Sequence, residues 1–230
     1  MKKVAIIVAA GNGTRMNSET PKQFLLLQNK PLLFYTIRAF VQAFDDMEII
    51  LVLPPSQIAK GQEIVDGFFD NSRFRFCEGG RTRFHSVQNG VQMLGDEASI
   101  VFVHDGARCF VSTALIQKCY EQALAKGTAI PAIAPSDSVR WLNEGDNQML
   151  DRKDVRLVQT PQTFLSTILV PAYNIDYKEH FTDEAAVVEA YGLKINLVEG
   201  EENNFKITTP LDYIVAANLI QNIESEETVD

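Results

Sequence analysis

The chain has 230 residues, an ordinary apolar content of 46% and a formal net charge of −9. This length suits a single α/β domain, and the composition excludes disordered and collagen-like proteins. The acidic balance argues against broad binding to nucleic acids or membrane surfaces. Three cysteines without a CxxC spacing are typical of a reducing compartment, so we expect a cytoplasmic protein. The apolar run after the two N-terminal lysines is too short for a signal peptide or a membrane span.

Apolar strands and amphipathic helices alternate along the first 135 residues. Continuous apolar runs predict buried strands, and apolar residues at helical spacing predict helices, although Gly90 weakens one of them. The expected strands are 3–10, 47–54, 73–80, 99–105 and 128–135. The expected helices are 31–44, 57–69, 81–94 and 112–127. This order predicts a doubly wound, mostly parallel sheet that binds ligands at the carboxyl ends of its strands.

Residues 136–160 interrupt this alternation. They carry nine charged residues and a turn-rich centre between two short alternating strands, which predicts a β-hairpin arm. An isolated hairpin is marginal in water, so the arm either lies on the main body or pairs with another subunit. The elements expected beyond it are a helix over 181–192, strands over 194–200 and 204–208, a closing helix over 209–223 and a disordered acidic tail over 224–230. All of them fit one domain, 1–230.

The loop after the first strand combines two glycines with two cations. Gly11 and Gly13 let backbone N–H groups approach an anion closely, and Arg15 and Lys22 follow. The first 38 residues hold six bases and one acid. Met16 replaces the third glycine of a dinucleotide fingerprint, and the P-loop lysine is absent. The loop therefore suits a polyphosphate, with a solvated positive surface as the alternative.

Six segments resemble, in order, the motifs of the 2-C-methyl-D-erythritol 4-phosphate cytidylyltransferase family. They are AAGNGTRM with PKQFL, EGGRTRFHSV, HDGAR, LDRKDVRLVQTPQTF, FTDEAA and NFKITTPLD. The resemblance implies a Rossmann-like, GT-A-like nucleotidyltransferase fold with a protruding arm. It also implies that methylerythritol phosphate attacks the α-phosphorus of CTP and that pyrophosphate leaves with Mg²⁺ assistance, in isoprenoid precursor synthesis. Ribitol-5-phosphate cytidylyltransferase shares most of these motifs, and a nucleotide-binding homologue without turnover is the alternative outside enzymes.

The resemblance assigns the nucleotide site to the first half of the chain. Arg15 and Lys22 match the pair that stabilises the transition state, while Gly80 and Ser86 match positions that read cytosine. The backbone cradle for CTP matches Ala9, Ala10, Gly11, Asn12 and Gly13. Asp105 ends an apolar strand, so we expect it to ligate Mg²⁺, accept from a ribose hydroxyl or cap a turn. Mg²⁺ itself is expected to be held mainly by the triphosphate.

The acceptor site is assigned to the second half. Arg152 and Lys206 match residues that position methylerythritol phosphate, which with Arg15 and Lys22 gives four expected catalytic residues. Arg152 lies in the arm, which in the family crosses to a partner, so we expect a homodimer with shared sites. The further expected substrate contacts are Arg108, Ser138, Thr160 and Thr182, of which Thr182 alternatively caps the next helix.

Three further residues in or next to these motifs are not assigned to the reaction. We expect His104 to pack rather than to catalyse, since attack by an ionised phosphate needs no histidine base. Arg83 is expected to serve structure or the electric field at the phosphates. Cys109 stands where the family usually has proline, which leaves the rigidity of that loop open.

Overall fold

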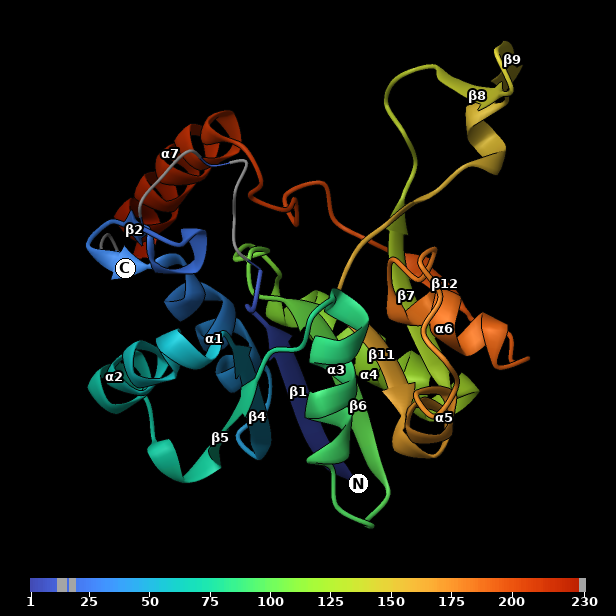
Figure 1. Cartoon of the computed structure of the whole chain (residues 1–230). Helices are drawn as coiled ribbons and strands as arrows, with labels where there is room; N and C mark the ends of the chain where they lie inside the picture. The colour runs from blue at the N-terminus through green and yellow to red at the C-terminus, as the bar shows by residue number, and fades with distance from the viewer. Residues whose placement is uncertain (12–15, 17–19, 228–230) are drawn as a thin grey trace.

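The computed structural model describes residues 1–11, 16 and 20–227, apart from the side chains of 222–227. Within these residues an eight-stranded sheet has the order β10-β7-β11-β6-β1-β4-β5, with β12 beside β7 (Figure 1). The strands of its parallel half are β1 (Lys2–Val8), β4 (Met47–Leu53), β5 (Phe74–Glu78) and β6 (Ser99–Asp105). The predicted α/β fold with a mostly parallel sheet is confirmed.

The other half of the sheet departs from a fully parallel pattern. Its strands are β7 (Thr128–Ile133), β10 (Leu157–Val158), β11 (Gln162–Leu165) and β12 (Leu197–Glu199). The strand β11 lies between β6 and β7 and runs antiparallel to both. The predicted strand over 204–208 is wrong. That segment is a loop. It lies beside the turn after β6, where Ile207 N–H donates to Ala107 O at 2.9 Å, and it pairs with no strand of the described sheet.

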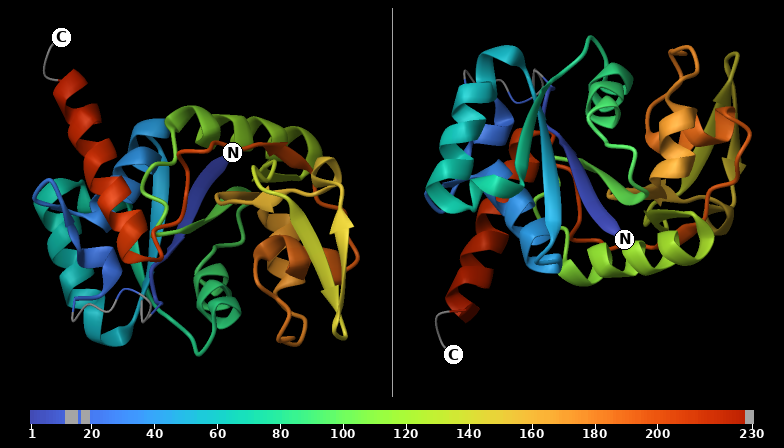
Figure 2. Two further views of the ribbon diagram at one scale, coloured as in Figure 1. Left: turned by 90° about the horizontal axis from the view of Figure 1, so that it is seen from above. Right: turned by 90° about the horizontal axis from the view of Figure 1, so that it is seen from below.

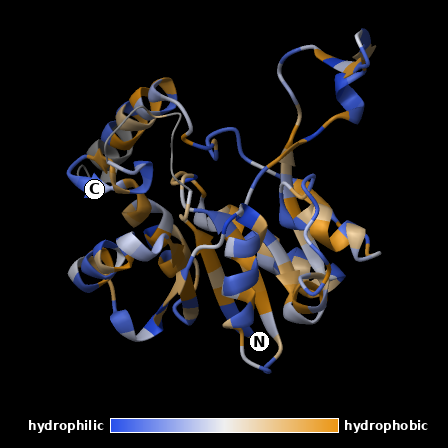
Figure 3. Cartoon of the chain, viewed as in Figure 1, coloured by the Kyte–Doolittle hydropathy of each residue, from blue (hydrophilic) through white to orange (hydrophobic). Residues whose placement is uncertain are grey.

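Helices cover both faces of the sheet (Figure 2). One face packs against α1 (Leu32–Ala43), α2 (Ile58–Phe68) and α4 (Thr113–Lys126), and α7 (Pro210–Glu227) joins the same apolar core beside β2. The other packs against α3 (Arg83–Gln92), α5 (Ser166–Ala172) and α6 (Glu184–Ala190). Alternation along β1 explains the two cores, since Ala5 and Ile7 join the first and Val4 and Ile6 the second. Figure 3 shows hydrophobic colouring concentrated in these central strands.

The helix ends follow local capping rules. Ser112 Oγ accepts from Leu115 N–H at the start of α4, the usual role of serine at this position. At the start of α7, Asp212 Oδ2 accepts from Thr209 N–H, and Thr209 Oγ1 accepts from Asp212 N–H. This helix continues to Glu227, into the stretch expected to be a disordered tail, because glutamates there extend a helix readily. Residues 228–230 lie outside the described part.

The remaining elements are short. They are β2 (Leu26–Leu27), β3 (Lys30–Pro31), the 3-10 turns η2 (Lys22–Phe24), η3 (Pro55–Gln57), η4 (Asn71–Arg73) and η5 (Arg152–Asp154), and the arm strands β8 (Val139–Asn143) and β9 (Asp146–Leu150). The arm strands pair with each other as a two-stranded sheet and project away from the body (Figure 1). Of the two placements considered for the arm, lying on the body is therefore wrong. Among the helices of the described part, none combines the length and apolarity that a membrane span needs.

Candidate active site

Three strand ends are joined by backbone hydrogen bonds at the carboxyl edge of the sheet. Ala9 N–H donates to Val52 O at 2.8 Å, and Gly106 N–H donates to Val8 O at 2.9 Å. These contacts hold the loops after β1 and β6 beside each other and beside β4. Together the loops surround a cavity of about 480 Å³, at the edge where ligands bind in open α/β sheets. The lining residues are Val8, Ala9, Ala10, Gly11, Lys22, Gln23, Gly80, Arg81, Thr82, Arg83, Ser86, Asp105, Gly106, Ala107 and Lys206.

The Gly-Gly turn after β5 forms one wall of this cavity. Gly80 N–H donates to Ser86 Oγ at 3.0 Å, and Ser86 Oγ donates to Thr82 O at 2.9 Å. The Ser86 hydroxyl therefore links the turn to the first turn of α3. A Cβ atom on Gly79 would lie 2.3 Å from Ala10 Cβ, so the turn and the glycine loop approach too closely for a side chain there.

Lys22 and Gln23 connect the 3-10 turn η2 to the same edge. Lys22 Nζ donates to Ile207 O at 3.1 Å, which places its ammonium group next to the segment that carries Lys206. Gln23 is buried, and its Nε2 group donates to Ala9 O at 2.9 Å. Sequence reasoning missed Gln23, although it directly follows Lys22 in the PKQF motif. We infer from these contacts that it fixes the start of the glycine loop.

Asp105 is the centre of a charged cluster at the end of β6. Its Oδ2 atom lies 2.8 Å from Lys206 Nζ and 3.9 Å from Arg108 Nε, and its Oδ1 atom lies 3.1 Å from Arg83 Nε. Burial alone would raise the pKa of Asp105, but these cations outweigh it and hold the pKa well below its usual value. The cluster thus keeps one ionised carboxylate at the cavity wall, beside Lys206.

A family model described as 2-C-methyl-D-erythritol 4-phosphate cytidylyltransferase (IspD) matches residues 3–222. The chain belongs to this family. Relatives of the same name from Bacteroides fragilis and Phocaeicola vulgatus are 43% and 44% identical over 220 residues, which is 96% of this chain and 100% of each relative.

Solved structures agree with this assignment. A 4-diphosphocytidyl-2C-methyl-D-erythritol synthase from Anaerococcus prevotii is similar with a TM-score of 0.82 at 27% identity, covering 96% of this chain and 99% of that one. A 2-C-methyl-D-erythritol 4-phosphate cytidylyltransferase from Thermus thermophilus has a TM-score of 0.74 at 32% identity, covering 96% and 100%.

The structure brings most residues of the expected nucleotide site of this cytidylyltransferase family to one cavity. Ala9, Ala10, Gly11, Gly80, Ser86 and Asp105 all line it, as do the expected cations Lys22 and Lys206. Three further expected residues, Asn12, Gly13 and Arg15, lie outside the described residues, so their positions stay predictions.

The expected acceptor residues divide into two groups, one around Asp105 and one on the arm. Ser138 and Arg152 are exposed on the arm, where Arg152 Nη1 donates to Ser136 O at 2.9 Å. Arg108 Nη1 donates to Asn204 O at 2.7 Å. Thr160 is buried, and its hydroxyl accepts from Asp105 N–H at 3.1 Å, so it holds the Asp105 backbone. None of these four is among the described residues that line the cavity.

Thr182 is exposed just before α6 and is likewise absent from the described lining of the cavity. Its alternative role as the helix cap is wrong, because Asp183 Oδ1 accepts from Ala186 N–H at 2.9 Å and occupies that position. The cap therefore lies one residue further along the chain.

The donor set fits a magnesium ion that brings most of its own ligands. Asp105 is ionised and lines the cavity, and the described residues contain no group of three acidic, histidine or cysteine side chains that could hold a metal alone. Mg²⁺ is commonly bound by one or two carboxylates together with substrate phosphates. Asp105 lines the cavity, but its oxygens are paired with Arg83 and Lys206, so the phosphates would supply most of the ligands.

Proposed function

We propose that the chain transfers CMP from CTP to 2-C-methyl-D-erythritol 4-phosphate, giving 4-diphosphocytidyl-2-C-methyl-D-erythritol and pyrophosphate for isoprenoid precursor synthesis. The observation that carries this is the cavity in which the glycine loop, the Gly-Gly turn and the two lysines of the family motifs meet. Membership of the family supports both substrates.

The reaction needs positioning and charge rather than a general base. An oxygen of the acceptor phosphate is already ionised at neutral pH and attacks the α-phosphorus, while the bond from that phosphorus to the pyrophosphate oxygen breaks. Negative charge accumulates on the α-phosphate oxygens as this happens, and fixed cations stabilise it. Lys22 supplies one such cation at the cavity, and Arg15 is proposed to supply another.

The nucleotide half of the site recognises CTP through backbone and small residues. We assign the phosphates to the loop of Ala9, Ala10, Gly11, Asn12 and Gly13. We assign the cytosine to Gly80 and Ser86, because both line the cavity and the Ser86 hydroxyl holds the narrow turn in place for a flat base. Mg²⁺ would be held mainly by the phosphates, with Asp105 at the cavity wall, and would neutralise part of their charge.

The acceptor half requires a second copy of the chain. Lys206 lines the cavity of its own chain, whereas Ser138 and Arg152 lie on an arm that pairs with itself and projects outward. We propose that the chain is a homodimer in which each arm brings Ser138 and Arg152 to the other subunit's cavity. Arg108, Thr160 and Thr182 complete the proposed acceptor site. The three cysteines are free, which supports a cytoplasmic location.

Pyrophosphate release tests this function directly. The purified chain is given Mg²⁺ and CTP, with methylerythritol phosphate and ribitol 5-phosphate in parallel reactions. We expect release with the first acceptor alone. Release with ribitol 5-phosphate would keep the CTP site and overturn the acceptor. Absence of release with either would overturn the proposed reaction.

A further inference from the structure

A buried acid lies behind the charged cluster and has no role in the reaction as described above. Glu184, the first residue of α6, has no exposed surface and binds the guanidinium of Arg83 through both carboxylate oxygens, with Arg83 Nη2 at 3.0 Å from Oε2 and Nη1 against Oε1. Tyr173 donates its hydroxyl to Glu184 Oε1 at 3.1 Å. A buried carboxylate is costly unless it is paired in this way, so the position is specialised for Arg83.

The pairing divides the nitrogens of Arg83 between two acids. The two terminal nitrogens face Glu184, which leaves Nε to donate to Asp105 Oδ1 at 3.1 Å. Asp105 Oδ2 is then available to Lys206 Nζ at 2.8 Å. The order Tyr173, Glu184, Arg83, Asp105, Lys206 is therefore a continuous chain of hydrogen bonds and ion pairs that ends at the cavity.

We infer that Glu184 is a positioning residue, which orients Arg83 so that Asp105 holds the Lys206 ammonium group in place for the acceptor phosphate. The role given to Lys206 rests on the proposed function, whereas the orientation of Arg83 rests on the contacts alone. Without Glu184, the terminal nitrogens of Arg83 lose their partner. A guanidinium prefers to bind a carboxylate through two nitrogens, and Asp105 is the acid already within its reach. Arg83 then takes both oxygens of Asp105 and displaces Lys206.

Electrostatics agrees with this geometry. Burial by itself would lower the pKa of Arg83, but Glu184 and Asp105 together raise it well above its usual value. Arg83 is therefore a permanent cation at the cavity wall. Glu184 balances part of that charge locally, so Arg83 occupies one oxygen of Asp105 and leaves the other to Lys206.

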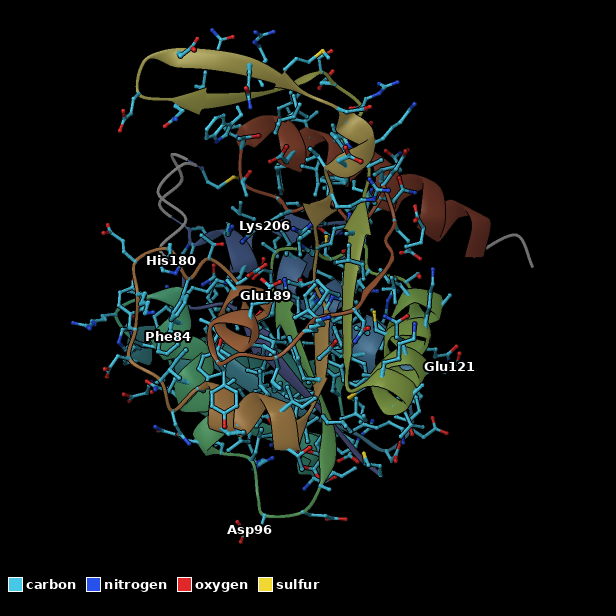
Figure 4. All side chains as sticks on the ribbon, turned by 90° about the vertical axis from the view of Figure 1, so that its right-hand side faces the viewer. Phe84, Asp96, Glu121, His180, Glu189 and Lys206 are labelled. Atoms are coloured by element: carbon cyan, nitrogen blue, oxygen red, sulfur yellow. The ribbon has the colours of Figure 1, made fainter. Side chains whose placement is uncertain are left out.

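The first test measures Lys206 itself and needs no turnover. Glu184→Gln keeps the size of the side chain and removes its charge. Glu189→Gln is the matched control, since Glu189 is an exposed residue of the same helix (Figure 4). Amine-reactive labelling is followed by peptide mass spectrometry, with Lys194 as internal reference because it is exposed in the same chain. We expect the labelling rate of Lys206 to rise about threefold or more in Glu184→Gln and to stay unchanged in Glu189→Gln. An unchanged labelling rate of Lys206 in Glu184→Gln would overturn the inference, whether or not the chain has the proposed activity.

The second test separates positioning from loss of folded protein. A misplaced Lys206 raises KM for methylerythritol phosphate by about tenfold and lowers kcat, while KM for CTP stays within about threefold. A smaller folded fraction lowers the apparent kcat and changes neither KM. Arg83→Lys keeps the positive charge but lacks the guanidinium nitrogens that bind Glu184 and Asp105 together. It should therefore show the same change in KM for methylerythritol phosphate and in kcat, even if Glu184→Gln folds poorly. Two folded variants with both KM values unchanged would overturn the inference, whereas an inactive unmutated chain would overturn the proposed function instead.

Discussion

Two neighbouring residues at the end of β6 differ in charge: Asp105 is ionised and His104 is neutral, each because of its surroundings. Asp105 stays ionised because three cations surround it. His104 is fully buried, with Nε2 at 3.0 Å from Arg108 O and Nδ1 at 3.1 Å from Thr160 Oγ1. Burial lowers the pKa of His104 to about 4, so the ring is neutral at pH 7. A neutral ring inside the core fits the expectation that His104 packs rather than catalyses.

The burial of His104 predicts a specific loss of stability in mild acid. The pKa of this histidine is about 4 in the folded chain and about 6.5 when unfolded, so the unfolded state binds more protons between these values. Stability is therefore complete above the unfolded pKa and falls as the pH drops below it. From pH 7 to pH 5, His104 should cost about 2 kcal/mol of unfolding free energy. Asp105 does not contribute in this window, because aspartate titrates near pH 4 when unfolded.

Urea unfolding at the two pH values measures this loss. His104→Gln, which takes up no proton, should lose about 2 kcal/mol less than the unmutated chain between pH 7 and pH 5. His180→Gln is the control, because His180 is exposed. Equal pH dependence in the unmutated chain and His104→Gln would contradict a neutral, buried histidine.

Among the elements, α3 shows how packing overrides helix propensity. Gly90 lowers the intrinsic stability of this helix. In the structure, however, a Cβ atom at Gly90 would lie 2.7 Å from Ile6 Cγ2 and 3.3 Å from Val52 Cγ2. Both neighbours are buried strand residues with branched side chains, which have little freedom to move. The glycine therefore lets α3 approach the sheet and bring Arg83 and Ser86 to the cavity.

Alanine substitutions at two helical glycines should have opposite effects. Gly90→Ala should destabilise the chain, because overpacking costs about 1–3 kcal/mol. The higher helix propensity of alanine offsets only part of this cost. Gly67→Ala in α2 is the matched control, since a Cβ there meets nothing within 4 Å, and it should stabilise by about 0.5–1 kcal/mol. Denaturant unfolding compares the two. Stabilisation by both substitutions would show that α3 has room at Gly90.

Local pattern predicted the long elements and missed those that depend on distant partners. Strands such as β4 and β6 were predictable because both of their faces are buried, which gives a continuous apolar run. The strand β11 has only four residues, and its pairing with β6 and β7 is invisible to local periodicity. The segment 204–208 looked like a strand because its side chains alternate, but it has no neighbouring strand edge.

The same limit applies to the site. The family resemblance identified residues that a single loop or turn brings together, such as Gly80 with Ser86. The ion pair between Arg83 and Glu184 joins residues 101 positions apart, and nothing in the sequence signals the contact. Glu184 lies inside the FTDEAA motif. The motif therefore pointed to this segment but did not predict that Glu184 pairs with Arg83.

For the molecule as a whole, the arm is the element that has no packing partner among the described residues of a single chain. Leu142 and Met149 share one face of the hairpin and are 76% and 71% exposed, and Trp141 on the opposite face is half-exposed. A two-stranded hairpin is marginal in water, and exposed apolar side chains on its strands do not stabilise it. A second copy of the chain would bury these side chains and receive the arm's Arg152 at the same time.

Mixing two inactive variants tests whether the arm is exchanged. Lys22→Ala damages the cavity, and Arg152→Ala damages the arm. If arms cross, a mixed dimer has one site with both defects and one site with neither. After the subunits are unfolded together and refolded at equal concentration, about half of the dimers are mixed, so we expect about a quarter of the unmutated rate of pyrophosphate release. If each arm served its own chain, every site would keep one defect. The mixture would then be no more active than the average of the two variants refolded separately, which are the controls. Size-exclusion chromatography of each preparation links the outcome to the dimer, since recovery of activity by a monomer would exclude exchange as its cause.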